Sequence, residues 1–274
     1  MTSIADIEIR LLVEAVFLRY GHDFRDYAPS SLKRRVLQAQ RRLGLPTVSA
    51  LQERVLHDQD GLALLLQALT VPVSEMFRDP GYFAALRQHV VPVLRTYPSL
   101  KVWVAGCSTG EEAYSMAILL QEEGLLERTI LYATDINHDS LDKARRGIFA
   151  LERMQQFTRN YQLAGGTAAF SDYYTADYDG VLMDKRLRQC ITFADHSLAT
   201  DAVFSEVQFV SCRNVMIYFN RRLQDRALGL FHGSLSHRGF LGLGSKETLD
   251  FSAYASRFEV VSRPERLYRK AVSG

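Results

Sequence analysis

The chain has 274 residues, 47% of them hydrophobic and 23% charged, enough for one large domain or a medium domain with a small companion. Its formal net charge of +2 is too small to indicate any class of partner by itself. Three widely spaced cysteines without a C-x-x-C pair, no run of 18 apolar residues and no secretory signal pattern argue against a zinc cluster, a membrane span and export, so we expect a cytoplasmic protein without a metal site.

The first 70 residues are expected to be helical throughout. Apolar spacing from Ile7 predicts a helix that ends at Gly21, and further helices are expected over 32–43, 48–57 and 61–69. On the second helix a basic face lies apart from the apolar stripe and consists of Arg34, Arg35, Arg41 and Arg42. This face is either an ordinary solvated surface or a landing surface for an acidic partner.

A connector and one helix follow this unit. Residues 71–80 contain two prolines and are expected to be non-helical, and a helix over 82–94 leads into the first strand.

The stretch from Lys101 to Tyr114 combines a buried strand, a glycine turn and a helix, which is how an open α/β sheet builds a ligand crevice. Its glycines lack the G-x-G-x-x-G spacing of a dinucleotide site, and Glu111 and Glu112 stand where a P-loop has Lys and Ser or Thr. Two carboxylates at a helix N-terminus would repel a phosphate. The turn therefore suits a ligand with cationic and hydroxyl-rich parts, such as S-adenosylmethionine, although acids in a first turn are also common capping residues.

A second buried strand at 130–133 leads to Asp135, about 25 residues beyond the turn, where an acid binds the ribose hydroxyls in nucleotide-binding βαβ units. The alternative is a helix N-cap, for which Asn137 or Asp139 is better placed. Further strands are expected at 190–194, 207–211 and 240–243, a helix at 220–236 and a terminal hairpin at 258–262 and 266–271. Turn signals at 165–166 and 177–180 among short aromatic runs predict an insertion with a small antiparallel element.

These elements predict an α/β fold in which a seven-stranded, Rossmann-like sheet has an antiparallel last strand and follows an all-α N-terminal domain. We divide the chain into a helical domain (1–70), a linker with its lead-in helix (71–98) and an α/β domain (99–274) that carries an inserted β-subdomain (148–188).

Three separated motifs resemble the chemotaxis receptor glutamate methyltransferases, the CheR family. They are Ala105-Gly-Cys-Ser-Thr-Gly-Glu-Glu-Ala-Tyr-Ser115, Ala133-Thr-Asp-Ile-Asn137 and Cys212-Arg-Asn-Val-Met-Ile-Tyr-Phe219. The resemblance covers nearly the whole chain and implies an S-adenosylmethionine-dependent methyltransferase that forms S-adenosylhomocysteine. Its implied acceptors are glutamates in the helical, glutamate-rich region of methyl-accepting chemoreceptors, which the inserted β-subdomain also contacts.

The resemblance also implies site residues. The family's connector motif Thr-x-Phe-Phe-Arg matches residues 74–78, which places Ser74 and Arg78 at the donor and Arg78 also at the acceptor carboxylate. Arg78 and Tyr218 are the expected catalytic residues. The remaining expected donor-binding residues are Gly106, Glu111, Asp135, Ser197, Leu198, Arg213 and Asn214, and the basic face is the expected acceptor surface. The sequence departs from the family pattern at Met76, Ala113, Ser197, Ser245 and Lys246.

Glutamate, with a reference pKa of about 4.3, is already a carboxylate at neutral pH, so methyl transfer to it needs no general base. Two alternatives stay open: a nucleic-acid methyltransferase, and a donor-binding adaptor with weak or no catalysis. The run from Arg213 to Met216 is not the Asn/Asp-Pro-Pro-aromatic run that seats an extruded base, so we expect no nucleic-acid partner. We also expect no membrane insertion, although the receptors themselves are membrane-bound.

Overall fold

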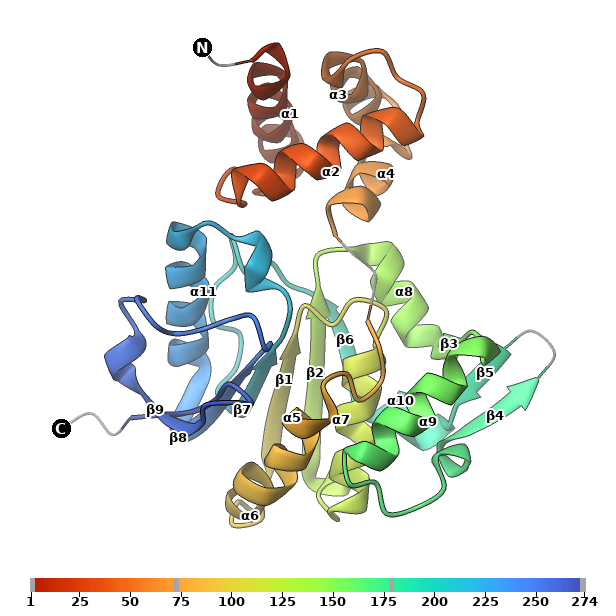
Figure 1. The fold of residues 1–274 in the computed structure, drawn as a ribbon, viewed down its shortest axis with the longest axis vertical. Helices are drawn as coiled ribbons and strands as arrows, with labels where there is room; N and C mark the ends of the chain where they lie inside the picture. Colours follow the sequence, from red (N-terminus) through yellow and green to blue (C-terminus); the bar gives the residue numbers. More distant parts are fainter. Residues whose placement is uncertain (1–2, 71–73, 178–179, 272–274) are drawn as a thin grey trace.

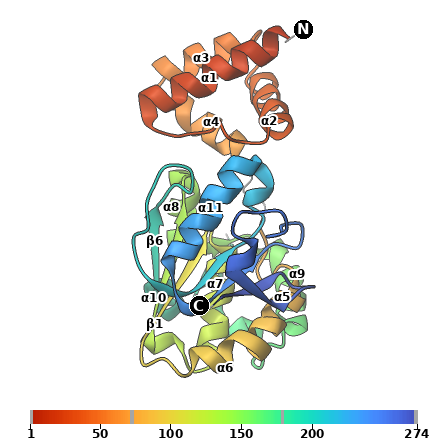
Figure 2. The same ribbon diagram turned by 90° about the vertical axis from the view of Figure 1, so that its left-hand side faces the viewer.

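A helical unit lies over one end of a twisted α/β sheet in the structure, a computed structural model that describes residues 3–70, 74–177 and 180–271 (Figure 1). A view turned by 90° shows the same stacked arrangement (Figure 2). Parts of two sequence predictions, the connector at 71–73 and the turn at 178–179, lie outside the described residues. The two units meet at the carboxyl ends of the parallel strands, where the candidate site lies.

The helical unit consists of α1 (Ile4–Tyr20), α2 (Pro29–Arg42), α3 (Val48–His57) and α4 (Gly61–Leu69), which confirms the four predicted helices. Ser3 and Asp6 form a capping box at the start of α1, and Gly21 ends that helix with φ 78°. The apolar faces of the four helices enclose a core of their own, whose fully buried members include Leu12, Val16, Val36, Leu51, Val55 and Leu65.

Seven strands form the main sheet in the order β6-β2-β1-β7-β8-β10-β9. Their bounds are β1 (Leu100–Ala105), β2 (Thr129–Asp135), β6 (Ile191–Asp195), β7 (Val207–Cys212), β8 (Leu235–Leu243), β9 (Phe258–Ser262) and β10 (Leu267–Lys270). β10 runs antiparallel to both neighbours, whereas the pairs around β1, β2, β6, β7 and β8 are parallel. The predicted seven-stranded sheet with an antiparallel last strand is confirmed.

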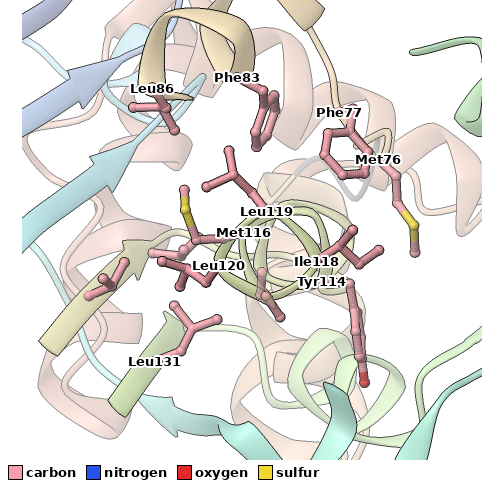
Figure 3. Close-up of a cluster of buried hydrophobic side chains, with 14 of the residues drawn as sticks. Met76, Phe77, Phe83, Leu86, Tyr114, Met116, Ile118, Leu119, Leu120 and Leu131 are labelled. Atoms are coloured by element: carbon pink, nitrogen blue, oxygen red, sulfur yellow. The ribbon is translucent and has the colours of Figure 1, made fainter. Parts of the chain in front are cut away.

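One face of the sheet is covered by α7 (Glu111–Glu122) and by the lead-in helix, which consists of α5 (Pro80–Ala85), a π-helical turn and α6 (Val91–Leu94). Figure 3 shows Leu119 of α7 directed toward Phe83 of α5, and Leu120 directed toward Leu131 of β2. The π-helical turn, absent from the sequence prediction, lies just before Pro92, whose nitrogen has no hydrogen to continue an α-helical ladder.

The opposite face is covered by α11 (Arg221–Ser234), whose Phe231 packs with Trp103 and Leu241 in a second core. The predicted helix at 220–236 is shorter than expected because Asn220 is its N-cap and β8 begins at Leu235. The strand expected at 240–243 is correspondingly longer.

The insertion contains the predicted antiparallel element, a sheet of β3 (Ile148–Phe149), β5 (Gly180–Met183) and β4 (Tyr174–Asp177) in the order β3-β5-β4. The sequence prediction missed two helices, α9 (Met154–Leu163) and α10 (Lys185–Cys190). Phe157 and Tyr161 stand one helical turn apart in α9 and are both buried. The aromatic spacing therefore reflects a helix. Cys190 ends α10 and does not start the following strand.

Candidate active site

A cavity opens at the carboxyl ends of the parallel strands, directly beneath the helical unit, with about 1200 Å³ of empty space that includes open solvent at its mouth. Nine of the predicted site residues line it: Ser74, Arg78, Gly106, Asp135, Ser197, Leu198, Arg213, Asn214 and Tyr218. They come from the connector, from the last residue of β2 and from the loops after β1, β6 and β7. Because β1 lies between β2 and β7, the cavity occupies the point where strand order reverses, the usual ligand crevice of such sheets.

The glycine turn after β1 can adopt its path only without side chains at two positions. Gly106 has φ 73°, and a Cβ atom there would lie 2.3 Å from Cγ2 of Val215. Gly110 has φ 95°, and a Cβ atom there would lie 2.9 Å from Cβ of Ala144 in α8 (His138–Arg146). The turn therefore packs closely against the loop after β7 and against α8.

Asp135 lines the cavity and also braces the turn. Its Oδ2 accepts the N–H of Ser108 at 2.9 Å, and its Oδ1 accepts the N–H of Asn137 at 2.9 Å. Burial raises the pKa of the Asp135 carboxyl, and these backbone hydrogen bonds oppose the rise. The N-cap of α8 is Asn137, whose Oδ1 accepts the N–H of Ser140 at 3.2 Å, so the capping alternative does not apply to Asp135.

The two glutamates after the turn point in different directions. Glu111 does not line the cavity: it is fully buried, and its Oε1 accepts from Arg153 of the insertion at 2.7 Å. Glu112 lines the cavity and accepts from Ser211 Oγ at 2.6 Å. Of the two glutamates only Glu112 therefore reaches the cavity, because successive residues of a helix face about 100° apart.

Arg213 lines the cavity, but its guanidinium donates its hydrogen bonds to other groups of the protein. It donates to the carbonyl oxygen of Arg78 and to Asp79 Oδ2, both at 2.8 Å, and to Glu112 Oε2 at 3.2 Å. Its side chain is 1% exposed, and its Cζ lies 4.1 Å from the ring centre of Tyr82. The residue clamps the connector to α7 and to the end of β7.

Two predicted residues keep their polar groups free. Among the residues that the structure describes, the Arg78 guanidinium has no hydrogen bond or ion pair, and the Tyr218 hydroxyl has no hydrogen bond. The ring of Tyr218 is stacked under the guanidinium of Arg35, with Cζ 4.5 Å from the ring centre. A cation and a hydroxyl are thus available in the cavity for a ligand.

The prediction that Arg35 belongs to the basic outer face of α2 is wrong. Arg35 is 9% exposed and reaches inward, with Nη1 3.4 Å from the carbonyl oxygen of Ala68. Arg34, Arg41 and Arg42 are exposed as expected. The seven-residue spacing paired the arginines correctly, but it could not show that the α/β unit covers the Arg35 side of the helix.

The helical unit supplies a cavity wall that carries no recognisable motif and that the sequence prediction missed. It is formed by the α1–α2 segment, with His22, Asp23, Phe24 and Tyr27 lining the cavity. The segment is fixed by hydrogen bonds from the N–H of Ala28 to the carbonyl oxygen of Tyr218 at 2.8 Å and from Asn220 Nδ2 to Asp26 Oδ1 at 3.0 Å. Burial lowers the pKa of His22.

The lining fits the parts of S-adenosylmethionine. Carboxylates of Glu112 and Asp135 suit its cationic groups and its ribose, and Leu198 and Ile136 offer apolar contacts. His196 also lines the cavity, is 8% exposed and has a buried Nδ1 without a hydrogen-bond partner among the described residues. That orphaned polar atom indicates a site for a polar ligand group.

In the described part of the chain, no group of three or more His, Cys, Asp or Glu residues could hold a metal ion. None of the described helices is long and apolar enough to cross a membrane.

Comparison with known families and proteins agrees with this geometry. The family described as "CheR methyltransferase, SAM binding domain" matches residues 72–266, and "CheR methyltransferase, all-alpha domain" matches residues 7–70. Cher3 of Pseudomonas putida is 65% identical over 266 residues, covering 97% of this chain and 97% of that protein. The chemotaxis protein methyltransferases of Salmonella typhimurium and Escherichia coli are 27% and 28% identical, covering 94% and 93% of this chain and 88% of each relative.

Proposed function

The chain belongs to the CheR family of S-adenosylmethionine-dependent methyltransferases, and we propose that it methylates glutamate side chains on chemoreceptor helices. In this proposal it is a protein-glutamate O-methyltransferase that acts in chemotaxis-type signalling and adaptation. The observation that carries the proposal is that Arg78 and Tyr218, whose polar groups have no partner among the described residues, share one cavity with the glycine turn.

The donor-binding part of the proposal assigns each group of the donor to a residue type. Asp135 takes the ribose hydroxyls with the lone pairs that its two backbone N–H bonds leave free. Glu112, in place of Glu111, faces the cationic part of the donor. The donor site is completed by Ser74, Asn214 and the segment at Ser197 and Leu198. Arg213 holds the connector and α7 in place around it through its hydrogen bonds to the Arg78 carbonyl oxygen, Asp79 and Glu112. When bound, the donor supplies a methyl group on a positively charged sulfur.

The acceptor-binding part rests on charge and on the exclusion of water. A glutamate carboxylate is ionised at neutral pH and needs no base. Arg78 orients that carboxylate, and the Tyr218 hydroxyl fixes its second oxygen or the methyl group. The reaction joins an anion to a cation, so a site from which water is excluded favours the loss of charge. Contacts to the carboxylate that are too strong would stabilise the reactant instead of the transition state.

Two surfaces are proposed to bind the receptor. Arg34, Arg41 and Arg42 are exposed on α2, the same helix whose Arg35 stacks on Tyr218, so an acidic helix held there would lie close to the cavity mouth. The insertion is the second surface, with β4 as an outer strand of its sheet. In this division, residues 1–70 dock the acceptor, the linker and lead-in helix at 71–98 supply Arg78, 99–274 carry the rest of the transfer site, and 148–188 make an additional contact.

The experiment is transfer of labelled methyl from S-adenosylmethionine to receptor-containing membranes, followed by treatment with base. A glutamate methyl ester releases volatile labelled methanol, whereas an N-methyl product does not. Base-stable label on the receptor would refute carboxyl methylation, and label on RNA or DNA instead would favour the nucleic-acid alternative. Tight donor binding without any transfer would favour the adaptor alternative.

A further inference from the structure

A single buried carboxylate holds the backbone of the loop that follows β7. Glu247 lies in the turn after β8 and is 5% exposed. Its Oε2 accepts the N–H groups of Asn214 at 2.9 Å and Gly244 at 2.6 Å. Its Oε1 accepts the N–H groups of Val215 at 2.9 Å and Ile217 at 3.3 Å. One side chain therefore satisfies four backbone donors from two separate loops.

These four hydrogen bonds require the two acceptor oxygens of a carboxylate, and a glutamine of the same shape could not accept them all. Two N–H groups converge on each oxygen of Glu247, and each oxygen has the two acceptor sites needed to receive them. Glutamine would keep one oxygen and turn an NH2 group toward two other donors. Those buried N–H groups would lose their acceptor.

Burial in the turn after β8 distinguishes the positions that depart from the family pattern from the one that does not. Ser245 and Lys246, where the sequence departs from the family pattern, are both exposed, whereas Glu247 points inward. A Cβ atom on Gly244 would lie 2.7 Å from Glu247 Oε2 and 2.8 Å from the nitrogen of Asn214. The two loops approach so closely at this point that no side chain fits between them.

The loop held by Glu247 is in an unusual conformation and touches the donor turn. Asn214 has φ 61°, in the left-handed region, which persists when surrounding contacts determine it. Val215 packs where a Cβ atom of Gly106 would otherwise stand. A shift of this backbone would therefore move both the side-chain amide of Asn214 and the glycine turn.

We propose that Glu247 is a positioning residue for the methyl-transfer reaction. It fixes the backbone from Asn214 to Ile217, so that the side-chain amide of Asn214 faces the donor. Tyr218, which directly follows Ile217, then faces the acceptor. The part concerning Tyr218 rests on the proposed function. The part concerning the donor rests only on the cavity and on membership of the family.

The test compares Glu247→Gln and Glu247→Asp with Glu122→Gln as a matched control. Glu122 is another glutamate with several partners: its side chain is 4% exposed, pairs with Arg87, and accepts from the N–H of Thr167 at 2.9 Å and from the hydroxyl of Tyr173 at 3.0 Å. It does not line the cavity. For each full-length variant, thermal unfolding is recorded, the Kd for S-adenosylhomocysteine is measured by calorimetry below the transition, and kcat and KM are measured for methyl transfer.

We expect Glu247→Gln to weaken S-adenosylhomocysteine binding at least tenfold and to lower kcat. Glu247→Asp, which keeps the charge but is one methylene shorter, should retain more affinity, and Glu122→Gln should keep the wild-type Kd even if it unfolds at a lower temperature. If the glutamine variant does not fold, the aspartate variant carries the test, with a weaker Kd than wild type expected.

A Kd and kcat within twofold of wild type in the folded Glu247 variants would overturn the proposal, as would an equal loss of affinity in the control. The Kd does not depend on the acceptor. If the wild-type protein forms no methyl esters but the Glu247 variants still lose affinity for S-adenosylhomocysteine, the positioning role is supported while the proposed function is refuted.

Discussion

The replacement of Arg213 by methionine separates a residue that holds the cavity together from one that serves a ligand. The substitution keeps an unbranched apolar stem but removes the guanidinium, which donates to the Arg78 carbonyl oxygen, to Asp79 and to Glu112. Glu112, 13% exposed, would then keep its charge without its counter-ion. Removing one partner of a buried ion pair costs about 3–5 kcal/mol, and Asp79, at 41% exposure, adds little because water solvates it.

That loss corresponds to a fall in Tm of about 6–20 °C for a protein of this size. The assay is denaturant unfolding followed by fluorescence, with thermal unfolding as a second probe. Arg78→Met is the matched control, because it applies the same change to a cavity arginine whose guanidinium has no partner among the described residues. It should change the free energy of unfolding by less than about 0.5 kcal/mol while lowering kcat. A loss below about 1 kcal/mol for Arg213→Met, or a larger loss for Arg78→Met, would refute this reasoning.

Three further changes probe the acceptor surface, the donor turn and the reacting centre. Arg34→Glu with Arg41→Glu should raise KM for receptor at low salt, with the effect shrinking as salt is added and the donor Kd unchanged; identical receptor kinetics at low salt would contradict a docking role. Gly106→Ala should abolish measurable S-adenosylhomocysteine binding in calorimetry, because φ is 73° and the new Cβ would stand 2.3 Å from Cγ2 of Val215; near-normal affinity would show that the turn tolerates a side chain. Tyr218→Phe should lower kcat about tenfold or more without weakening donor binding, and an unchanged kcat in single-turnover assays would remove the hydroxyl from the proposed mechanism.

Local patterns predicted most of the secondary structure because each depends on nearby residues. The bounds of α3 and α4, the end of α1 at Gly21 and the strand-turn-helix around Gly106 follow from apolar periodicity and from glycine's access to positive φ. The helix α9 was missed because its two buried aromatic residues, one turn apart, stand just before a run of strong turn signals, which drew the whole segment into the predicted antiparallel element.

The same limit applies to the site. Motifs identified the residues of the connector, of the end of β2 and of the loops after β1, β6 and β7, which line the cavity because their strands share one edge of the sheet. Motifs carried no information on the wall at His22 and Tyr27, because that wall exists only through the docking of the helical unit.

The sequence by itself determined the fold class, the donor turn and the family, since these depend on local spacing and on residue types. Tertiary structure alone decided which of two adjacent side chains faces the cavity: Glu112 and not Glu111, and, on α2, Arg35 turned inward while Arg34 stays in solvent. Adjacent helical residues differ by about 100° in direction, so the outcome depends on what packs against each side. For the turn that opens at Gly106, that partner is the loop after β7, held by Glu247.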